Sequence, residues 1–328
     1  MRCLFFFSLS CSLLASPSLD EKVTLFAKKY QVQGITVGLL PDREISSCGT
    51  LSFHSLVPVN EESIFRIGYL TQPFTAYVLA QLVQEGKVKL TDSATQFLSR
   101  NAKMPSFHGE PITFLTLATH TSGLPDAYFN PDSFSVGGMF RFLKGYELPY
   151  APGSRYQFSN LGYGLLTHLL GRVGRQGYPN MIDRMIIKPQ KLVDTTFSLN
   201  MDQKKRLSMG SFGEQEIKVD DGDNFASVFI GSRGLYSTLN DLMTFALFLM
   251  TDEPIALMIK QSYFHFPKFD TGLGLTLSPS GVYSIESSLF GYSSLIYFTK
   301  KGGVVILANR GDLPLNDLAK DLLGIVNK

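Results

Sequence analysis

The stretch Phe65-Arg-Ile-Gly-Tyr-Leu-Thr-Gln-Pro-Phe-Thr-Ala76 decides how the rest of this chain is interpreted. From residue 72 to residue 85 the apolar side chains recur at helical spacing. Thr71 is a candidate N-cap residue, and Gly86 is a typical stop signal. We therefore predict a buried helix, with Tyr69 immediately before its first turn.

Four further segments contain recognisable patterns of turn residues and apolar residues. They are LATHTSGLP at 117–125, PGSRYQFSNLGYGLL at 152–166, GLYSTLNDL at 234–242, and GYSS at 291–294 followed by KGGVVILAN at 301–309. Breaker residues in these segments indicate tight turns next to buried elements. Other stretches predict strands at 33–41, 49–57, 289–298 and 302–308, and helices at 161–173, 239–250 and 315–326.

In their order and spacing, the five segments resemble those of the class C β-lactamase and penicillin-binding-protein-like serine hydrolases. The corresponding family patterns are F-x-I-G-S-x-T-K-x-F-T, LLTHTSGLP, PGxxFxYSNxGYxLL, GLYSTAxDLA and GFSS…KGVGVVVLxN. The resemblance implies a fold of the α/β (α+β) class, in which helices flank an antiparallel sheet. It also implies an α/β lobe at about 19–85 and 230–328 and a mostly helical lobe at about 86–229.

The chain departs from this family at the positions that carry its chemistry. Tyr69 stands in place of the nucleophilic serine, and Gln72 in place of the lysine that helps to remove the serine proton. Phe158 replaces the tyrosine that donates a proton, and it has no hydroxyl group. A tyrosine hydroxyl ordinarily ionises only near pH ~10, and a glutamine accepts no proton at neutral pH. We therefore expect no functional catalytic residue at these positions.

A gap-free alignment places Ile285, Glu286 and Ser287 at the family's K-T-G or H-x-G motif. In this alignment, Ile285 stands in place of the cation that holds a substrate carboxylate in the family. Ser287 replaces a glycine that leaves room for substrate, and Glu286 would repel an anionic ligand. Asn160 is retained, and the resemblance implies a contact with a ligand amide. We expect binding residues at Tyr69, Asn160, Glu286 and Ser287.

The first residues have the pattern of a secretory signal peptide, which we place at about 1–18. Arg2 supplies a positive start, residues 3–14 are apolar or small, and the first acidic residues follow at 20 and 21. We therefore expect export to the periplasm or the exterior of a bacterium. Cys11 could carry a lipid anchor, although the residues before it match a lipoprotein signal poorly.

The composition excludes several other classes of function. The 328 residues carry a net charge of only +2, so no strong field indicates a nucleic-acid partner. No stretch after the leader reaches the ~20 apolar residues of a membrane span. After removal of the leader, Cys48 is the remaining cysteine, and the histidines show no ligand spacing. We expect no metal and no cofactor.

Three hypotheses follow from these residues. The first is a secreted pseudoenzyme that binds a peptidoglycan-like peptide, another small envelope ligand or a protein partner. The second is a divergent hydrolase (β-lactamase, D-Ala-D-Ala peptidase or esterase) with a rebuilt site, in which Tyr69 acts with Glu286 or a water. The third is a structural envelope protein whose cleft is filled by Tyr69, Phe158 and Ile285.

Overall fold

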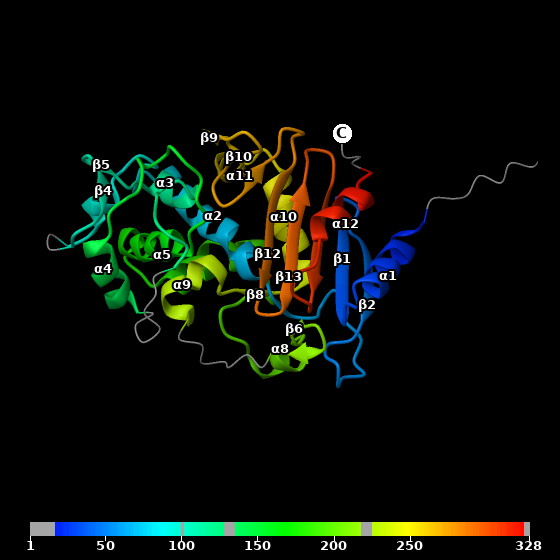
Figure 1. Cartoon of the computed structure of the whole chain (residues 1–328). Coiled ribbons are helices and arrows are strands. Elements are labelled where there is room, and N and C mark those ends of the chain that lie inside the picture. Colours follow the sequence, from blue (N-terminus) through cyan, green and yellow to red (C-terminus); the bar gives the residue numbers. More distant parts are fainter. Residues whose placement is uncertain (1–16, 100–101, 128–134, 218–224, 325–328) are drawn as a thin grey trace, which may run out of the picture.

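The structure, a computed structural model, describes residues 17–99, 102–127, 135–217 and 225–324 (Figure 1). Of the expected signal peptide, the structure describes residues 17 and 18 alone. Cys11 lies outside the described residues.

An eight-stranded sheet in the order β2-β1-β14-β13-β12-β11-β10-β9 forms the centre of the fold. Its strands are β1 (Gly34–Leu40), β2 (Glu44–Gly49), β9 (Phe264–His265), β10 (Asp270–Thr271), β11 (Thr276–Leu277), β12 (Tyr283–Leu289), β13 (Tyr292–Phe298) and β14 (Gly303–Ala308). Every neighbouring pair is antiparallel. Because β1 pairs with β14, residues from both parts of the chain close one sheet. The predicted antiparallel sheet is confirmed.

Helices cover both faces of this sheet. Their bounds are α1 (Leu19–Lys29), α2 (Thr71–Gln84), α3 (Phe114–Ala118), α4 (Val136–Gly145), α5 (Asn160–Gly174), α6 (Tyr178–Ile182), α7 (Lys188–Gln190), α8 (Met201–Lys205), α9 (Phe225–Arg233), α10 (Leu239–Met250), α11 (Pro254–Lys260) and α12 (Leu315–Leu322). Figure 1 shows α1 and α12 on one side of the sheet, with the other large helices opposite. An ion pair between Lys22 Nζ and Asp321 Oδ2, 3.2 Å apart, joins α1 and α12.

The side chains of strand β14 pack alternately into two hydrophobic cores. Val304 and Ile306 pack in the cluster under α1 and α12, whereas Val305 and Leu307 belong to the large cluster that includes α10. Successive side chains of a strand point to opposite faces. A strand buried on both faces is therefore apolar throughout, as β14 is.

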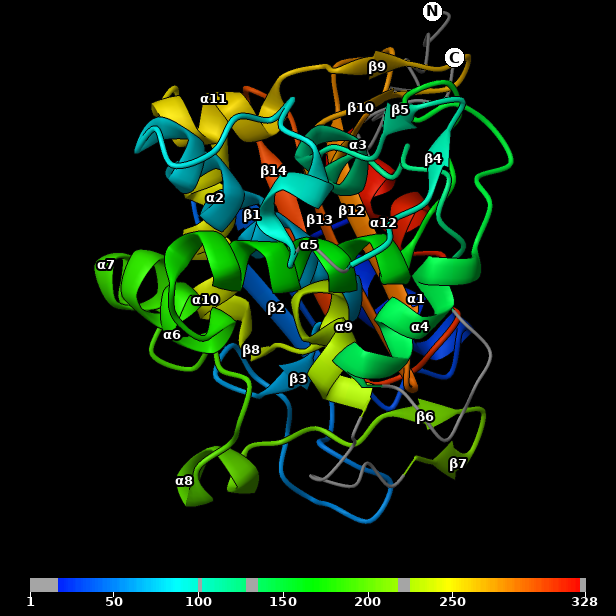
Figure 2. The same ribbon diagram turned by 90° about the vertical axis from the view of Figure 1, so that its left-hand side faces the viewer.

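The shorter elements lie between the main ones. They are β3 (Phe65–Arg66), β4 (Ser106–Phe107), β5 (Glu110–Pro111), β6 (Ser211–Phe212), β7 (Gln215–Glu216), β8 (Tyr236–Ser237), the 3₁₀ turns η1 (Gly68–Leu70) and η2 (Ala94–Phe97), and the π-helical turn η4 (Asp183–Ile187). Figure 2 looks onto the helical layer, in which α5 crosses the view and α2 and α9 pack against it. The boundaries of the two predicted lobes stay predictions.

Most predicted elements are confirmed, and the exceptions have physical causes. The second strand is Glu44–Gly49 instead of 49–57, because β2 is a sheet edge whose residues are largely polar and exposed. The prediction missed β12, whose sequence YSIESSL mixes polar and apolar residues. Thr71 is not an N-cap residue, since the 3₁₀ turn η1 runs directly into α2. Its Oγ1 instead donates to the Gly68 carbonyl, 2.7 Å away.

Within the described ranges, no single helix has the length and apolar character needed to cross a membrane, and only the pair α10 and α11, bent by 88°, passes that test jointly.

Packing of α2 against α10 predicts a large effect of one core substitution. Phe74 of α2 is fully buried, and its ring stacks on Phe245 of α10 with centroids 3.9 Å apart. We expect Phe74→Ala to lower the free energy of unfolding by about 3–5 kcal/mol, because it removes buried area and leaves a cavity. Leu56→Ala is the control, since Leu56 is 97% exposed, and its effect should stay within about 0.5 kcal/mol. Urea unfolding measures both, and equal effects would contradict the assignment.

Candidate functional site

Three elements bring the predicted site residues together. The turn η1 and the first turn of α2 hold Tyr69 and Gln72. The N-terminus of α5 holds Asn160, directly after its N-cap residue Ser159. The loop after α3 contains His120, which has a positive φ of 57° and contacts Gln72 of α2. Residues 48 to 91 positions apart in sequence therefore make direct side-chain contacts here.

Gln72 lies fully buried at the centre of this group. Its Oε1 is 2.9 Å from His120 Nε2, and its Nε2 donates to Ser232 Oγ at 3.2 Å. The Ser232 hydroxyl in turn donates to Asn160 Oδ1. The position expected to hold a cationic base in the family is thus occupied by a neutral amide with both ends bonded.

One backbone group fixes the direction of this chain of hydrogen bonds. The Ser159 N–H donates to His120 Nδ1 at 3.0 Å, so that nitrogen carries no proton. Burial lowers the pKa of His120 to about 3, so its ring is neutral at pH 7 and carries its proton on Nε2. Gln72 Oε1 must therefore accept, and the Gln72 amide nitrogen and the Ser232 hydroxyl must each donate to the next group.

Asn160 is the other end of the network. It is 2% exposed, and its Nδ2 donates to Asp126 Oδ1 at 2.6 Å. The same nitrogen lies 3.4 Å from the Tyr69 hydroxyl, a long contact. Its Oδ1 accepts from Ser232. Both ends of the amide are thus engaged within the protein, and a ligand amide could bind it only by displacing one of these partners.

Aromatic and aliphatic side chains fill the space next to the network. The Phe158 ring lies 4.7 Å from the Tyr69 ring and 4.5 Å from the His120 ring, measured between centroids. A cavity of about 30 Å³ remains among residues that include Gln72, Phe158 and Ile285. A cavity needs about 10–15 Å³ to hold one water, so this space is large enough for about two or three waters.

Ser287 of β12 packs against the turn η1. It is 3% exposed, and its hydroxyl has no hydrogen-bond partner among the described residues. A Cβ added to Gly68 would collide with Ser287 Oγ, and the φ of Gly68 is +51°. The side chain at 287 therefore packs directly against the turn that carries Tyr69.

Glu286 lies elsewhere than expected. Alternation along β12 points it to the face opposite Ser287, where it is exposed and accepts a hydrogen bond from Asn316 of α12. The expectation that Glu286 faces a ligand beside Tyr69 is contradicted by this geometry. A role for Glu286 as a partner of Tyr69 in a rebuilt hydrolase is contradicted by the same geometry.

Sequence reasoning missed three participants. Ser232 lies just before the segment at 234–242, and Asp126 directly follows the segment at 117–125. His120 lies within the segment at 117–125, and its backbone carbonyl accepts from the Gln157 N–H at 2.8 Å. Their positions next to the recognised segments were the available signal, but the pairing between segments depends on the fold.

Comparisons with known proteins show the family and the fold of the chain. The model of the family described as Beta-lactamase matches residues 19–325. The chain belongs to the beta-lactamase family. Structures of a beta-lactamase/D-alanine carboxypeptidase from Yersinia pestis and of one from Pseudomonas syringae share the fold, with TM-scores of 0.81 and 0.82 and identities of 22% and 18%. They cover 93% and 94% of this chain, which in turn covers 98% of each.

Two curated family members illustrate the range of similarity. The D-alanyl-D-alanine-carboxypeptidase/endopeptidase AmpH of Escherichia coli is 32% identical over 191 residues, which are 56% of this chain and 48% of AmpH. A beta-lactamase of Pseudomonas fluorescens is 23% identical over 273 residues, which are 79% of this chain and 74% of that protein. The match therefore spans about half the length of AmpH.

The buried neutral His120 predicts a pH dependence of stability. Its folded pKa of about 3 lies below its ordinary value of 6.5, so folding favours the neutral form. Its contribution is fully present above pH 6.5 and is lost as the pH falls toward 3. We expect the free energy of unfolding to fall by about 1.4 kcal/mol per pH unit in this window on account of His120.

Urea unfolding between about pH 7 and about pH 5 measures this slope. The variant His120→Gln should lose it, whereas His54→Gln should keep it, because His54 is exposed. Burial also lowers the pKa of His168, but that residue is common to all three proteins and cancels in the comparison. Equal slopes for all three would contradict a neutral buried His120.

Proposed function

We propose that this chain is a non-catalytic member of the beta-lactamase family, an exported pseudoenzyme that binds a cell-envelope ligand. The observation that carries the proposal is the buried Gln72, whose amide is bonded at both ends to His120 and Ser232. Acyl transfer to a hydroxyl needs a base within hydrogen-bond reach of the nucleophile. Among the described residues, the one hydrogen-bond partner of the Tyr69 hydroxyl is the Asn160 amide nitrogen, which is not a base.

The residues around Tyr69 and Asn160 support a ligand different from that of the family's enzymes. Asp126 is exposed beside Asn160, and Tyr69 is half-buried next to it. Ile285 stands where the resemblance implies a cation for a substrate carboxylate. An exposed carboxylate without that cation favours a ligand whose end is neutral or positively charged. We therefore propose a peptide-like envelope ligand held through an amide or amine and not through a carboxylate.

A second candidate is a structural envelope protein with a filled cleft. The small size of the cavity beside Phe158 and Ile285, about 30 Å³, favours this candidate, and so does the close packing of Ser287 on Gly68. The two candidates differ in whether the surface formed by Tyr69 and Asp126 binds anything.

The proposed loss of chemistry predicts that the mature protein forms no acyl adduct. We expect no mass gain on intact-protein mass spectrometry with a fluorescent penicillin, and no turnover of a chromogenic cephalosporin. The variant Tyr69→Ser/Gln72→Lys/Phe158→Tyr, which restores the family residues on this scaffold, is measured alongside to test whether the scaffold still aligns them. An adduct or turnover by the native protein that Tyr69→Phe abolishes would show that Tyr69 is a nucleophile, and the proposal would be wrong.

Ligand binding separates the two candidates. A stem peptide that ends in D-Ala-D-Ala and its C-terminally amidated form are added in thermal unfolding assays. We expect the amidated peptide to raise the melting temperature more, because Asp126 disfavours the free carboxylate. Asp126→Asn should reduce this difference. If neither peptide nor a digest of whole peptidoglycan shifts the melting temperature, the filled-cleft candidate replaces the binder.

A further inference from the structure

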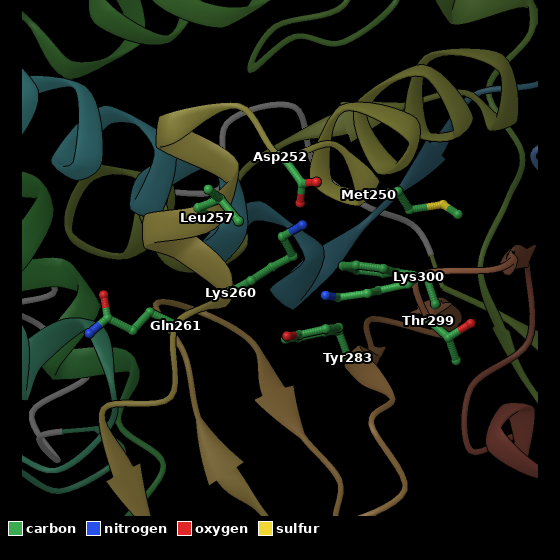
Figure 3. Close-up of a pocket in the computed structure, with 9 residues that line it drawn as sticks. Met250, Asp252, Leu257, Lys260, Gln261, Tyr283, Thr299 and Lys300 are labelled. Atoms are coloured by element: carbon green, nitrogen blue, oxygen red, sulfur yellow. The ribbon is translucent and has the colours of Figure 1, made fainter.

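A second pocket lies away from the site of Tyr69, where α11 meets one end of β12 and β13. Its volume is about 160 Å³, and Figure 3 shows nine residues that line it. This is larger than the cavity beside Gln72, but smaller than the ~300–1,000 Å³ of pockets that take drug-sized ligands. The space therefore suits a molecule of a few heavy atoms.

Lys260 is the unusual member of the lining. It is the last residue of α11 and is 8% exposed, although lysine is almost never fully buried without a partner. Among the described residues, the one hydrogen bond of its ammonium goes to the carbonyl of Thr251, 2.7 Å away. An ammonium has three N–H groups, so this contact with the end of α10 leaves donor capacity for a molecule in the pocket.

A second cation lies close to the first. Lys300 is exposed, follows β13 and lines the same pocket. Burial is the largest cause that lowers the pKa of Lys260, and the charge of Lys300 lowers it to a smaller extent. Figure 3 shows the Lys300 ammonium and the Tyr283 hydroxyl directed into the space beside α11 that Lys260 borders. An anion bound between two ammonium groups is attracted by both.

Asp252 offsets only part of this positive charge. It is exposed and lines the same pocket, and its charge raises the pKa of Lys260 by more than the charge of Lys300 lowers it. No carboxylate of the described chain lies within ion-pair distance of Lys260. Two lysines and one aspartate leave a net positive pocket, and the Tyr283 hydroxyl adds a neutral donor.

We propose that this pocket binds a small oxyanion, with a phosphate or carboxylate group placed between Lys260 and Lys300. The site is separate from the proposed function at Tyr69 and does not depend on it. Phosphate should bind more tightly than acetate, since it carries more charge and more acceptor oxygens.

Thermal unfolding of the mature protein with inorganic phosphate tests the proposal, with sodium chloride at matched ionic strength as the reference and acetate as the second anion. A ligand that binds only the folded protein raises its melting temperature. We expect a shift with phosphate above that with chloride, and a smaller shift with acetate. Titration of the shift with phosphate gives the affinity.

Neighbouring residues supply matched variants. Lys300→Ala should weaken the phosphate affinity by about threefold, the scale of one exposed ion pair. Lys301→Ala should leave it unchanged, because Lys301 is exposed and lies outside the lining. Asp252→Asn should strengthen the affinity, since it removes a competing negative charge. Lys260→Met should abolish the phosphate shift relative to its own baseline, whatever its effect on folding.

The proposal is wrong if phosphate and chloride give the same shift, which would leave Lys260 as a cap of α10 and nothing more. It is also wrong if Lys300→Ala and Lys301→Ala weaken phosphate equally, because binding would then follow net charge and not the pocket.

Discussion

The hydrogen bond from the Ser159 N–H to His120 Nδ1 is the contact on which the arrangement of the site depends. A backbone N–H can only donate, so it selects the tautomer of His120 and, through it, the orientation of Gln72. The three elements that meet here are far apart in sequence, and the network joins α2, the loop after α3 and the start of α5. Since His120, Gln72, Ser232 and Asn160 are all buried, an unpaired polar group among them would cost about 1–3 kcal/mol.

This dependence explains why a neutral glutamine fits at position 72. A lysine there would place an ammonium beside Ser232 and the neutral His120 ring, in a region where burial already lowers the pKa of His120 to about 3. Burial penalises the charged form of either residue. Glutamine supplies one acceptor and one donor in one plane, which is what His120 and Ser232 require. A neutral amide at this position accepts no proton at neutral pH, which is the basis of the proposed loss of activity.

The sequence predicts the fold well because the fold rests on local signals. Apolar runs such as β14 and helical spacing such as that of α2 can be recognised in the sequence without knowing which elements pack against them. The five recognised segments mark the turns between these elements. Predictions failed at edges and mixed strands: β2 is polar because it closes the sheet, and β12 is mixed because only part of it is buried. In both cases the pattern of polar and apolar residues depends on which residues are buried, and the sequence alone does not give that.

The site was predictable in its positions and not in its contacts. Tyr69, Gln72, Phe158 and Ile285 were located by comparison with the family patterns, and the structure brings them within one region. Glu286 was misplaced because a gap-free alignment gives register along a strand but does not say which face a residue occupies. Asn160 is retained in sequence, yet its amide is bonded to Asp126 and Ser232. The retained motif therefore does not by itself give the partners of Asn160, because they come from segments that only the fold brings together.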